Sequence, residues 1–246
     1  VFTVIDWMGK AVRDSISTLG ENVVYVQKFP WSFDQNLAWW DIIKWPAVTQ
    51  NDYHAILTRS TKVESVCFSA LQPRQIKFKN NLANDVVIWA ATHEFEDLRS
   101  FEIEKGRYFS PDESTTGKNV AVLGAEIAGR LFDKADPVGK QVTIGNTKAI
   151  VIGIFKKEGK GGITDSGMDE LILVPMNFGK TFINMRSRSL ESNLMIKARE
   201  GVPVEELSDE TTMILRAARR LRPGETSNFS VNRASLLTQG FDAVFK

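Results

Sequence analysis

Two histidines are the residues of this sequence best suited to bind a metal ion or to transfer a proton. His54 lies in a segment of helical periodicity, and His93 directly follows an apolar run. A protein zinc site needs three or four converging ligands, and neither histidine has a second ligand at a recognised spacing. His93-Glu94 begins like the zinc-helix motif His-Glu-x-x-His, but the second histidine is absent. The sequence therefore predicts no metal site and no cofactor.

Three further patterns could suggest chemistry, and each has the wrong spacing or is too short to be specific. Residues 158–164 are rich in glycine, but they lack the spacing of a phosphate-binding Walker A loop. We interpret residues 156–167 as a mobile hairpin loop. Asn228-Phe229-Ser230 matches the glycosylation pattern, which is non-specific. No Gly-x-Ser-x-Gly nucleophile elbow occurs, so we predict no catalytic residue and favour a binding, coupling or structural role.

Composition and charge are those of an ordinary globular protein. The 246 residues carry a formal net charge of +1, and 43% of them are hydrophobic. This balance argues against a dedicated nucleic-acid binder, which usually presents a strongly basic face. The single cysteine, Cys67, lies in an apolar run and is expected in the core. An intramolecular disulfide and a cysteine-based metal site are therefore excluded.

Four tryptophans lie close together between residues 29 and 45. One interpretation is that their rings pack a long loop onto the core, because aromatic rings dominate core energetics. The other is an exposed surface for a partner, a ligand or a membrane interface, since so many exposed tryptophans are a liability unless they bind something. We favour the first interpretation. The tryptophans are Trp31, Trp39, Trp40 and Trp45.

A group of arginines follows the last long helical pattern. We expect this group to form a solvated face of that helix, and a contact with an acidic partner is the alternative. The arginines are Arg216, Arg219, Arg220 and Arg222.

Both ends of the sequence have helical stripes. Apolar residues recur every three to four positions in residues 1–19, and again from residue 235 to the end. No apolar run approaches the roughly 18 residues that span a bilayer. Two interpretations stay open: a piece of a longer protein, or a complete domain with amphipathic terminal helices.

Between these ends, strand and helix patterns alternate around a central block of short strands. Thr49 is a plausible N-cap for a helix over residues 50–58. In residues 104–176, short apolar runs alternate with glycine and proline turns, and Gly145-Asn146 predicts a hairpin. We predict an α+β fold in which this β-rich unit is inserted into an α/β unit of residues 1–103 and 177–246. Further strands are expected at 22–27, 63–70, 74–79, 85–92, 193–198 and 228–232, turns at 80–81 and 84–85, and helices at 94–101 and 204–222.

The central block also contains an ordered series of short motifs. They are Gly106-Arg107-x-Phe109 with Asp112, Val120-x-Val122-Leu123-Gly124, Leu131-Phe132, Pro137-Val138-Gly139-Lys140, Val151-x-Gly153 and Leu173-Val174-Pro175.

In order and spacing, this series resembles the MacB-like periplasmic core domain. That domain belongs to permease subunits of ABC transporters, a class that includes macrolide exporters, lipoprotein-release machinery and FtsX-type proteins. The resemblance covers nearly the whole chain. Glycine, proline and buried apolar residues dominate the motifs, so they are a signature of the fold and supply no catalytic group. The signature residues are Gly106, Arg107, Phe109, Gly124, Pro137, Gly139, Gly153 and Pro175.

The resemblance implies an α/β porter subdomain interrupted by a β-rich Sabre subdomain, at the periplasmic face of the bacterial inner membrane. The domain would be non-enzymatic, with the ATPase in another domain or chain. It would relay ATP-driven helix movement to the periplasm, a process called mechanotransmission, for export of an antibiotic, peptide or lipoprotein. Its partners would be its own transmembrane helices, a second permease chain and the ATP-binding domain or subunit. A periplasmic adaptor and an outer-membrane channel are further candidates, and nucleic acid is not expected.

The alternative hypothesis is a free-standing periplasmic module that binds a small or lipidic ligand. The tryptophan-rich segment, which lies outside the motifs of the family, would then line the binding site.

Overall fold

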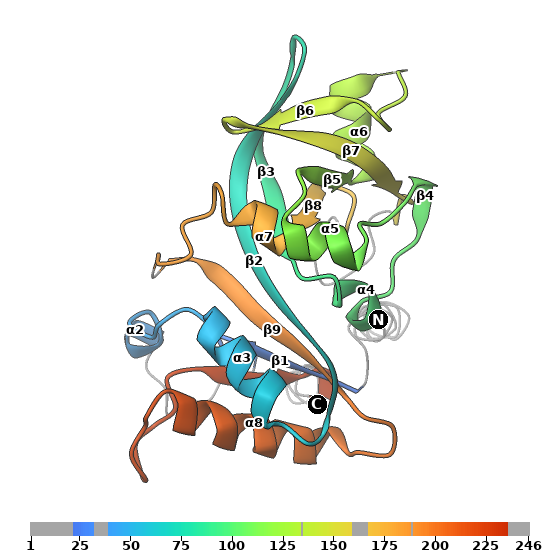
Figure 1. Cartoon of the computed structure of the whole chain (residues 1–246). Helices are drawn as coiled ribbons and strands as arrows, with labels where there is room; N and C mark the ends of the chain where they lie inside the picture. The colour runs from blue at the N-terminus through green and yellow to red at the C-terminus, as the bar shows by residue number, and fades with distance from the viewer. Residues whose placement is uncertain (1–21, 32–38, 134, 159–166, 188, 236–246) are drawn as a thin grey trace, which may run out of the picture. The chain divides into compact units, whose positions relative to one another are not determined.

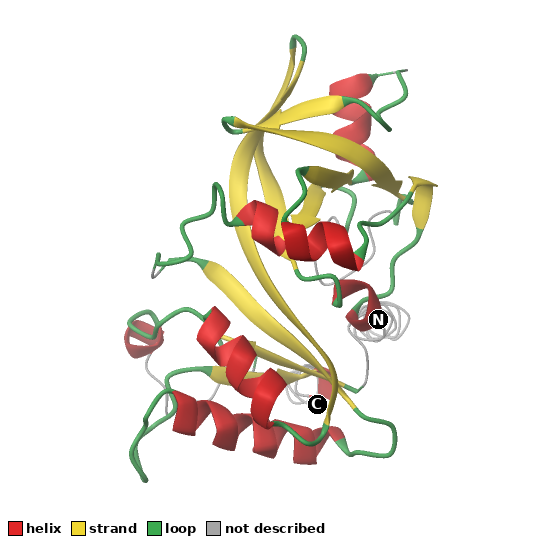
Figure 2. Ribbon diagram, in the orientation of Figure 1, coloured by secondary structure: helices red, strands yellow, loops and turns green. Residues whose placement is uncertain are grey.

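The computed structural model describes residues 22–31, 39–133, 135–158, 167–187 and 189–235 (Figures 1 and 2). The chain has a mixed α+β architecture, as predicted, and divides into two compact units. Unit 1 comprises Val1–Phe68, Asp97–Arg99 and Arg186–Lys246, and unit 2 comprises Ser69–Glu96 and Ser100–Met185.

The sheet of unit 1 has the strand order β10-β1-β9-β2, and the first part of β2 belongs to it. Strand β1 is antiparallel to both neighbours, so that Val24 lies opposite Arg233 on β10 and Ile196 on β9. Its run of β-branched and aromatic residues suits a strand that is buried along nearly all of its length. The bounds are β1 Val23–Gln27, β2 Val63–Phe78, β9 Glu191–Ala198 and β10 Ser230–Arg233.

In unit 1, helix α3 packs against helix α8, and α8 also contacts β1 and β10 (Figure 1). Thr49 caps α3 as predicted: its side chain accepts from the backbone N–H of Asp52, whose carboxylate accepts from the N–H of Thr49. Helix α8 ends four residues earlier than predicted, because the chain turns at Arg220, which has a left-handed φ of 54°. The helices are α2 Trp39–Ile42, α3 Gln50–Arg59 and α8 Val204–Ala218.

The sheet of unit 2 has the order β2-β3-β8-β5-β7-β4, and β6 pairs with both β2 and β7. The predicted hairpin is confirmed as β6 and β7, joined at Gly145 with φ of 58°. Strands β3 and β8 are parallel, as are β5 and β7. The elements are β3 Asn81–Ala91, β4 Ile103–Gly106, β5 Val120–Leu123, β6 Gln141–Ile144, β7 Thr147–Phe155, β8 Leu171–Pro175, α5 Pro111–Thr116, α6 Ala125–Phe132 and α7 Met176–Gly179, and α4 Phe95–Leu98 spans the division of the units.

Strand β2 differs from the prediction. It is one strand of sixteen residues that belongs to both units, where the sequence indicated two shorter strands. The register shifts between Arg74 and Ile76, so an irregularity accommodates the break in the apolar pattern. The turn predicted at Asn84-Asp85 is also wrong, because both residues lie within β3. Asp85 has a left-handed φ of 52°, which short polar residues tolerate.

Unit 2 is larger than the predicted insertion of residues 104–176. Strand β3 pairs in parallel with β8, from Val87 opposite Leu171 to Ala91 opposite Pro175. This pairing brings residues 69–96 into unit 2, although we predicted them for the flanking α/β unit. The assignment of unit 1 to a porter subdomain and unit 2 to a Sabre subdomain stays a prediction.

The predicted terminal helices lie outside the described residues, apart from Ser235. Within the ranges that are described, no helix is long and apolar enough to span a membrane.

Candidate functional site

The tryptophans of the segment 29–45 fall into two environments. Trp39 and Trp40, on α2, are 64% and 62% exposed, so the expectation that they pack onto the core is wrong for this pair. Trp31 is half-buried, with its ring 5.0 Å from that of Tyr25, and Trp45 is also half-buried. Residues 32–38 lie outside the described ranges. One pair of rings therefore faces solvent, while the other two are only partly exposed.

Two more large apolar side chains of the same segment are exposed. Phe29 is 48% exposed and Ile43 is 44% exposed. Phe29, Trp39, Trp40 and Ile43 are called the aromatic surface below. They are four of the eight large hydrophobic side chains that are exposed in the described part of the chain. Apolar side chains gathered in this way are typical of an interaction site.

Asn232 of β10 anchors the beginning of the segment. Its amide Nδ2 donates to the carbonyl of Phe29 at 3.0 Å, and its Oδ1 accepts from the N–H of Trp31 at 2.9 Å. The side chain is 1% exposed, so both ends of a buried amide are used to hold the backbone around Pro30. The ammonium group of Lys28 donates to the carbonyl of Ile43 at 2.5 Å and joins the two ends of the segment. Sequence reasoning did not identify Asn232.

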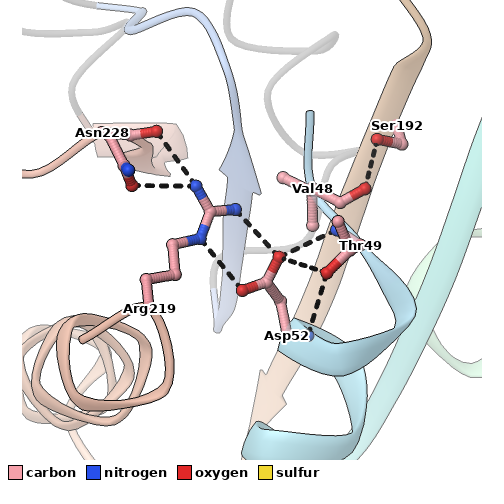
Figure 3. Close-up of polar contacts among 6 residues, drawn as sticks. All are labelled: Val48, Thr49, Asp52, Ser192, Arg219 and Asn228. Carbon is pink, nitrogen blue, oxygen red and sulfur yellow. Dashed lines mark hydrogen bonds and ion pairs between the residues drawn. The ribbon is translucent and has the colours of Figure 1, made fainter. Parts of the chain in front are cut away.

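Polar contacts also anchor the chain where the segment ends (Figure 3). The hydroxyl of Ser192, at the start of β9, donates to the carbonyl of Val48 at 2.7 Å in a buried position. The next residue, Thr49, forms the capping box with Asp52. The segment is thus fixed to β10 at one end, and to β9 and the beginning of α3 at the other.

Asp52 forms a buried ion pair with Arg219 (Figure 3). Nε and Nη2 of Arg219 lie 3.0 and 2.9 Å from the two carboxylate oxygens, and the side chains are 9% and 4% exposed. Nη1 donates to the carbonyl and to Oδ1 of Asn228, both at 3.0 Å, and the guanidinium lies over the ring of Phe229. The pair therefore links α3, the end of α8 and the loop that leads to β10.

The prediction of a solvated arginine face is wrong for two of the four arginines. Arg219 is buried in the ion pair with Asp52. Arg216 donates to the carbonyls of Glu225 and Arg222, which fixes the loop after α8. The loop folds back along the helix and supplies these acceptors, and a helical pattern does not reveal that. Arg220 and Arg222 are exposed.

The aromatic surface belongs to one end of the unit 1 sheet. Strand β1 ends at Gln27, opposite Ser230, where β10 begins, and the segment follows directly. The chain enters β1 at Val23 and leaves β10 at Arg233, at the other end of the same strand pair. The segment and the points where the chain enters and leaves this strand pair are therefore at opposite ends of the sheet.

The signature glycines lie in unit 2, where backbones approach closely. Gly106 has φ of 81°, and a Cβ there would overlap the carbonyl oxygen of Ile152. It lies opposite Gly153 of β7, where a Cβ would come within 2.5 Å of the carbonyl oxygen of Arg107. Gly124 precedes α6, and a Cβ there would overlap the carbonyl oxygens of Met168 and Asp169. Side chains are excluded at these places because strand and loop backbones are in contact.

The other signature residues form turns and core contacts of unit 2. Pro137 begins the turn that its carbonyl closes with Lys140, and Gly139 has φ of 79°. Pro175 ends β8 and precedes α7, and Phe109 is 1% exposed. None of them forms part of the aromatic surface.

Arg107 and Glu113 form a forked ion pair in unit 2. The two nitrogens of Arg107 lie 2.7 and 2.9 Å from the carboxylate oxygens of Glu113. Glu113 also accepts from the backbone N–H of Ser110 and completes the capping box of α5. The hydrogen bonds from Arg107, followed by that from Ser110, lower the pKa of Glu113 to about 2. This contact gives Arg107 of the signature a structural role in unit 2.

The two histidines belong to different units. His93, in unit 2, has its Nε2 3.1 Å from a carboxylate oxygen of Glu96 and stacks on Tyr108. His54 is exposed on α3 of unit 1. No group of three or more histidine, cysteine, aspartate or glutamate side chains could hold a metal ion within the described ranges.

Fold and motifs together define the periplasmic domain of an ABC transporter permease. A family model, the MacB-like periplasmic core domain, matches residues 1–214, and the chain belongs to this family. The resemblance found in the sequence is therefore confirmed.

Relatives and solved structures agree with this assignment. The macrolide export ATP-binding/permease protein MacB of Bdellovibrio bacteriovorus is 25% identical over 174 residues, which are 71% of this chain and 26% of the relative. The chain thus spans about a quarter of the length of that curated relative. The periplasmic region of MacB from Actinobacillus actinomycetemcomitans has the same fold, with a TM-score of 0.73 and 15% identity over 95% of this chain and 98% of the other. The extracellular domain of the transporter YknZ from Gram-positive bacteria has a TM-score of 0.63 and 19% identity, over 85% of this chain and 99% of the other.

Proposed function

We propose that this domain relays ATP-driven movement of transmembrane helices to the periplasm, for export of a substrate such as an antibiotic, a peptide or a lipoprotein. The observation that carries the proposal is the pairing of β1 with β10, in which Val24 lies opposite Arg233. In the described residues, β1 is the first strand of the chain and β10 is the last. Displacements of the two flanking segments would therefore act on adjacent strands of one sheet.

Unit 1 is built to move as a body. Polar contacts join α3 and α8, so we expect the two helices to move together. The Asp52–Arg219 pair joins the two helices at one end. Glu210 of α8 accepts from Ser60 and Thr61, just after α3, and joins them further along. A shift of one helix against the other would leave the buried charges of Asp52 and Arg219 unpaired, which makes such shifts costly.

In this proposal the ATPase is a separate domain or subunit, and two permease chains work together. The aromatic surface, together with the partly buried Trp31 and Trp45, contacts a partner or ligand in the periplasm. A periplasmic adaptor joined to an outer-membrane channel is one such partner. The position of the segment supports this role, because it lies at the end of the sheet away from Val23 and Arg233.

Distance measurements on the intact transporter test the relay. A spin label on Asp209→Cys, an exposed position of α8, reports the separation of unit 1 in the two permease chains. The native Cys67 is fully buried and is not expected to react. We expect the distance to change between the ATP-bound and nucleotide-free states, and not in an ATPase-inactive variant. An unchanged distance in the active protein would refute the relay.

The exposure of Trp39 and Trp40 favours a second candidate, a free-standing module that binds a small or lipidic ligand. Tryptophan fluorescence titration and native mass spectrometry for a co-purifying ligand test it. The full-length gene product separates the two candidates. The relay requires an apolar run of about 20 residues before Val1 and several after Lys246, and the free-standing module requires none.

A further inference from the structure

The lysines of the described residues divide into two groups. In one group, each ammonium group donates to a carboxylate, carbonyl or amide oxygen, as in Lys62 with Glu206 and Lys197 with Glu64. In the other group, the ammonium groups make no ion pair or hydrogen bond with the described residues. All members of the second group are exposed, and all belong to unit 2. They are Lys77, Lys79, Lys118, Lys140 and Lys148.

Strand register places two of these lysines in one row. Lys77 of β2 lies opposite Thr143 of β6, which lies opposite Lys148 of β7. Residues next to each of them along the strands, such as Ile76 and Ala149, are buried in the core. Because successive side chains of a strand point to opposite faces, Lys77, Thr143 and Lys148 point outward. The spacing of strands puts the two lysine backbones about 10 Å apart.

Ile150 is an exposed apolar residue beside this row. It is 44% exposed and lies two residues from Lys148, on the same face. Its N–H donates to the carbonyl of Asn119 at 2.9 Å, and the side chain of Asn119 donates to the carbonyl of Lys148. Lys118 precedes Asn119, so the backbone places it next to Ile150 as well. An exposed branched apolar side chain thus lies on the same strand face as Lys148 and, along the backbone, close to Lys118.

The two carboxylates on which Lys118 and Lys140 act are each paired directly with another cation. Glu113 is paired with Arg107, and Asp136 lies 2.7 Å from Lys105. Lys118 and Lys140 act on the two carboxylates only at longer range, as minor contributors to their lowered pKa values. In the described residues, no direct ion pair therefore neutralises Lys77, Lys118 or Lys148.

We propose that the lysine face, defined as Lys77, Lys118, Lys148 and Ile150, binds an acidic segment of a partner protein that places an apolar side chain on Ile150. Complementary charge identifies the partner as acidic, and such charges accelerate association and select the partner. A protein segment is favoured over a lipid surface because the face lacks the aromatic anchors of membrane-binding surfaces. The proposal goes beyond the relay function and does not depend on it.

Fluorescence anisotropy with a synthetic probe tests the lysine face. The probe is a labelled peptide of glutamates with one central leucine. We expect the chain to bind it at low salt and to lose most of this affinity at about 0.5 M salt, where the Debye length is only a few ångström. The double variant Lys77→Gln/Lys148→Gln should bind at least about tenfold more weakly, which is 1.4 kcal/mol.

The matched control is Lys62→Gln/Lys197→Gln, which removes the same charge from paired lysines of unit 1. Equal weakening in both double variants would show that net charge alone attracts the peptide, and would overturn the proposal. Ile150→Ser should weaken the leucine peptide and leave a serine-substituted peptide unaffected. If phosphatidylglycerol vesicles bind through the same lysines and displace the peptide completely, the face is a lipid site and the proposal is wrong.

Discussion

The contacts that stabilise unit 1 internally differ in kind from those within unit 2. In unit 1, buried polar side chains join segments that are far apart in sequence, as in the Asp52–Arg219 pair, whose members are 167 residues apart. In unit 2, strands approach closely at glycines such as Gly106 and Gly153, which face each other across β4 and β7. The first kind depends on complementary charges and hydrogen bonds, and the second on the absence of side chains.

The same division applies to the signature residues of the family and to the aromatic surface proposed to bind a partner: they lie in different units. The signature residues lie in unit 2, where Gly106, Gly124 and Gly153 occupy backbone contacts too close for a side chain. The aromatic surface lies in unit 1, on a segment that buried polar groups hold at its ends. Such a segment can change its exposed side chains while the anchors keep its position. The signature motifs thus lie in unit 2, while the aromatic surface lies in unit 1.

The largest effect is expected from the buried pair of unit 1. Arg219→Met leaves the carboxylate of Asp52 buried without its cation, which should reduce the free energy of unfolding by about 3–5 kcal/mol. Urea unfolding measures this loss. The control is Arg233→Met, since Arg233 pairs with the exposed Glu205 and should cost about 1 kcal/mol or less. Equal losses in the two variants would show that the buried pair does not hold unit 1 together.

Replacing two glycines of unit 2 by alanine should change the stability in opposite directions. Gly124→Ala forces a Cβ into the carbonyl oxygens of Met168 and Asp169, and should destabilise by about 3 kcal/mol. Gly129, inside α6, has open space where an alanine Cβ would lie, so Gly129→Ala should stabilise by about 1 kcal/mol through helix propensity. Thermal unfolding distinguishes them. If Gly124→Ala is tolerated as well as Gly129→Ala, close backbone contact does not explain the signature.

Glu113 makes the stability of unit 2 depend on pH. Its pKa is about 2 in the folded protein and 4.5 ordinarily, so its contribution is complete above about pH 4.5 and disappears as the pH falls towards 2. Glu113→Gln should cost about 2 kcal/mol at pH 7. Urea unfolding from pH 7 to 2 should show the variant and the parent protein converging. The control Glu170→Gln removes an exposed partner of Arg130 and should change the free energy of unfolding little. If the Glu113 variant is less stable than the parent by the same amount at pH 2 as at pH 7, the assignment is contradicted.

The smallest effect on stability is expected at the aromatic surface. Trp39→Ser/Trp40→Ser removes two rings that are mostly exposed, so the free energy of unfolding should change by no more than about 0.5 kcal/mol. Chemical denaturation checks this value. A loss above about 2 kcal/mol, of the size that core aromatic rings produce, would restore the interpretation that these rings pack onto the core.

Local signals in the sequence predicted much of the fold. The N-cap at Thr49 and the hairpin at Gly145 are confirmed because each depends on residues a few positions apart. Asn84-Asp85 indicated a turn, and Asp85 does have the left-handed φ that is common in turns, but it lies inside β3. The sequence could not distinguish a turn from a left-handed residue within a strand, because strand pairing decides whether such a residue ends the strand or distorts it.

The sequence by itself determined the family and the mixed architecture, because glycines at close contacts and the periodicity of apolar residues are properties of the chain. Only the tertiary structure decided which distant polar groups meet. Asn232 reaches the backbone of Phe29, and Asp52 reaches Arg219, across more than 160 residues in each case. It also decided which tryptophans face solvent. Exposure is set by what packs against a side chain, and four neighbouring tryptophans look alike until the chain is folded.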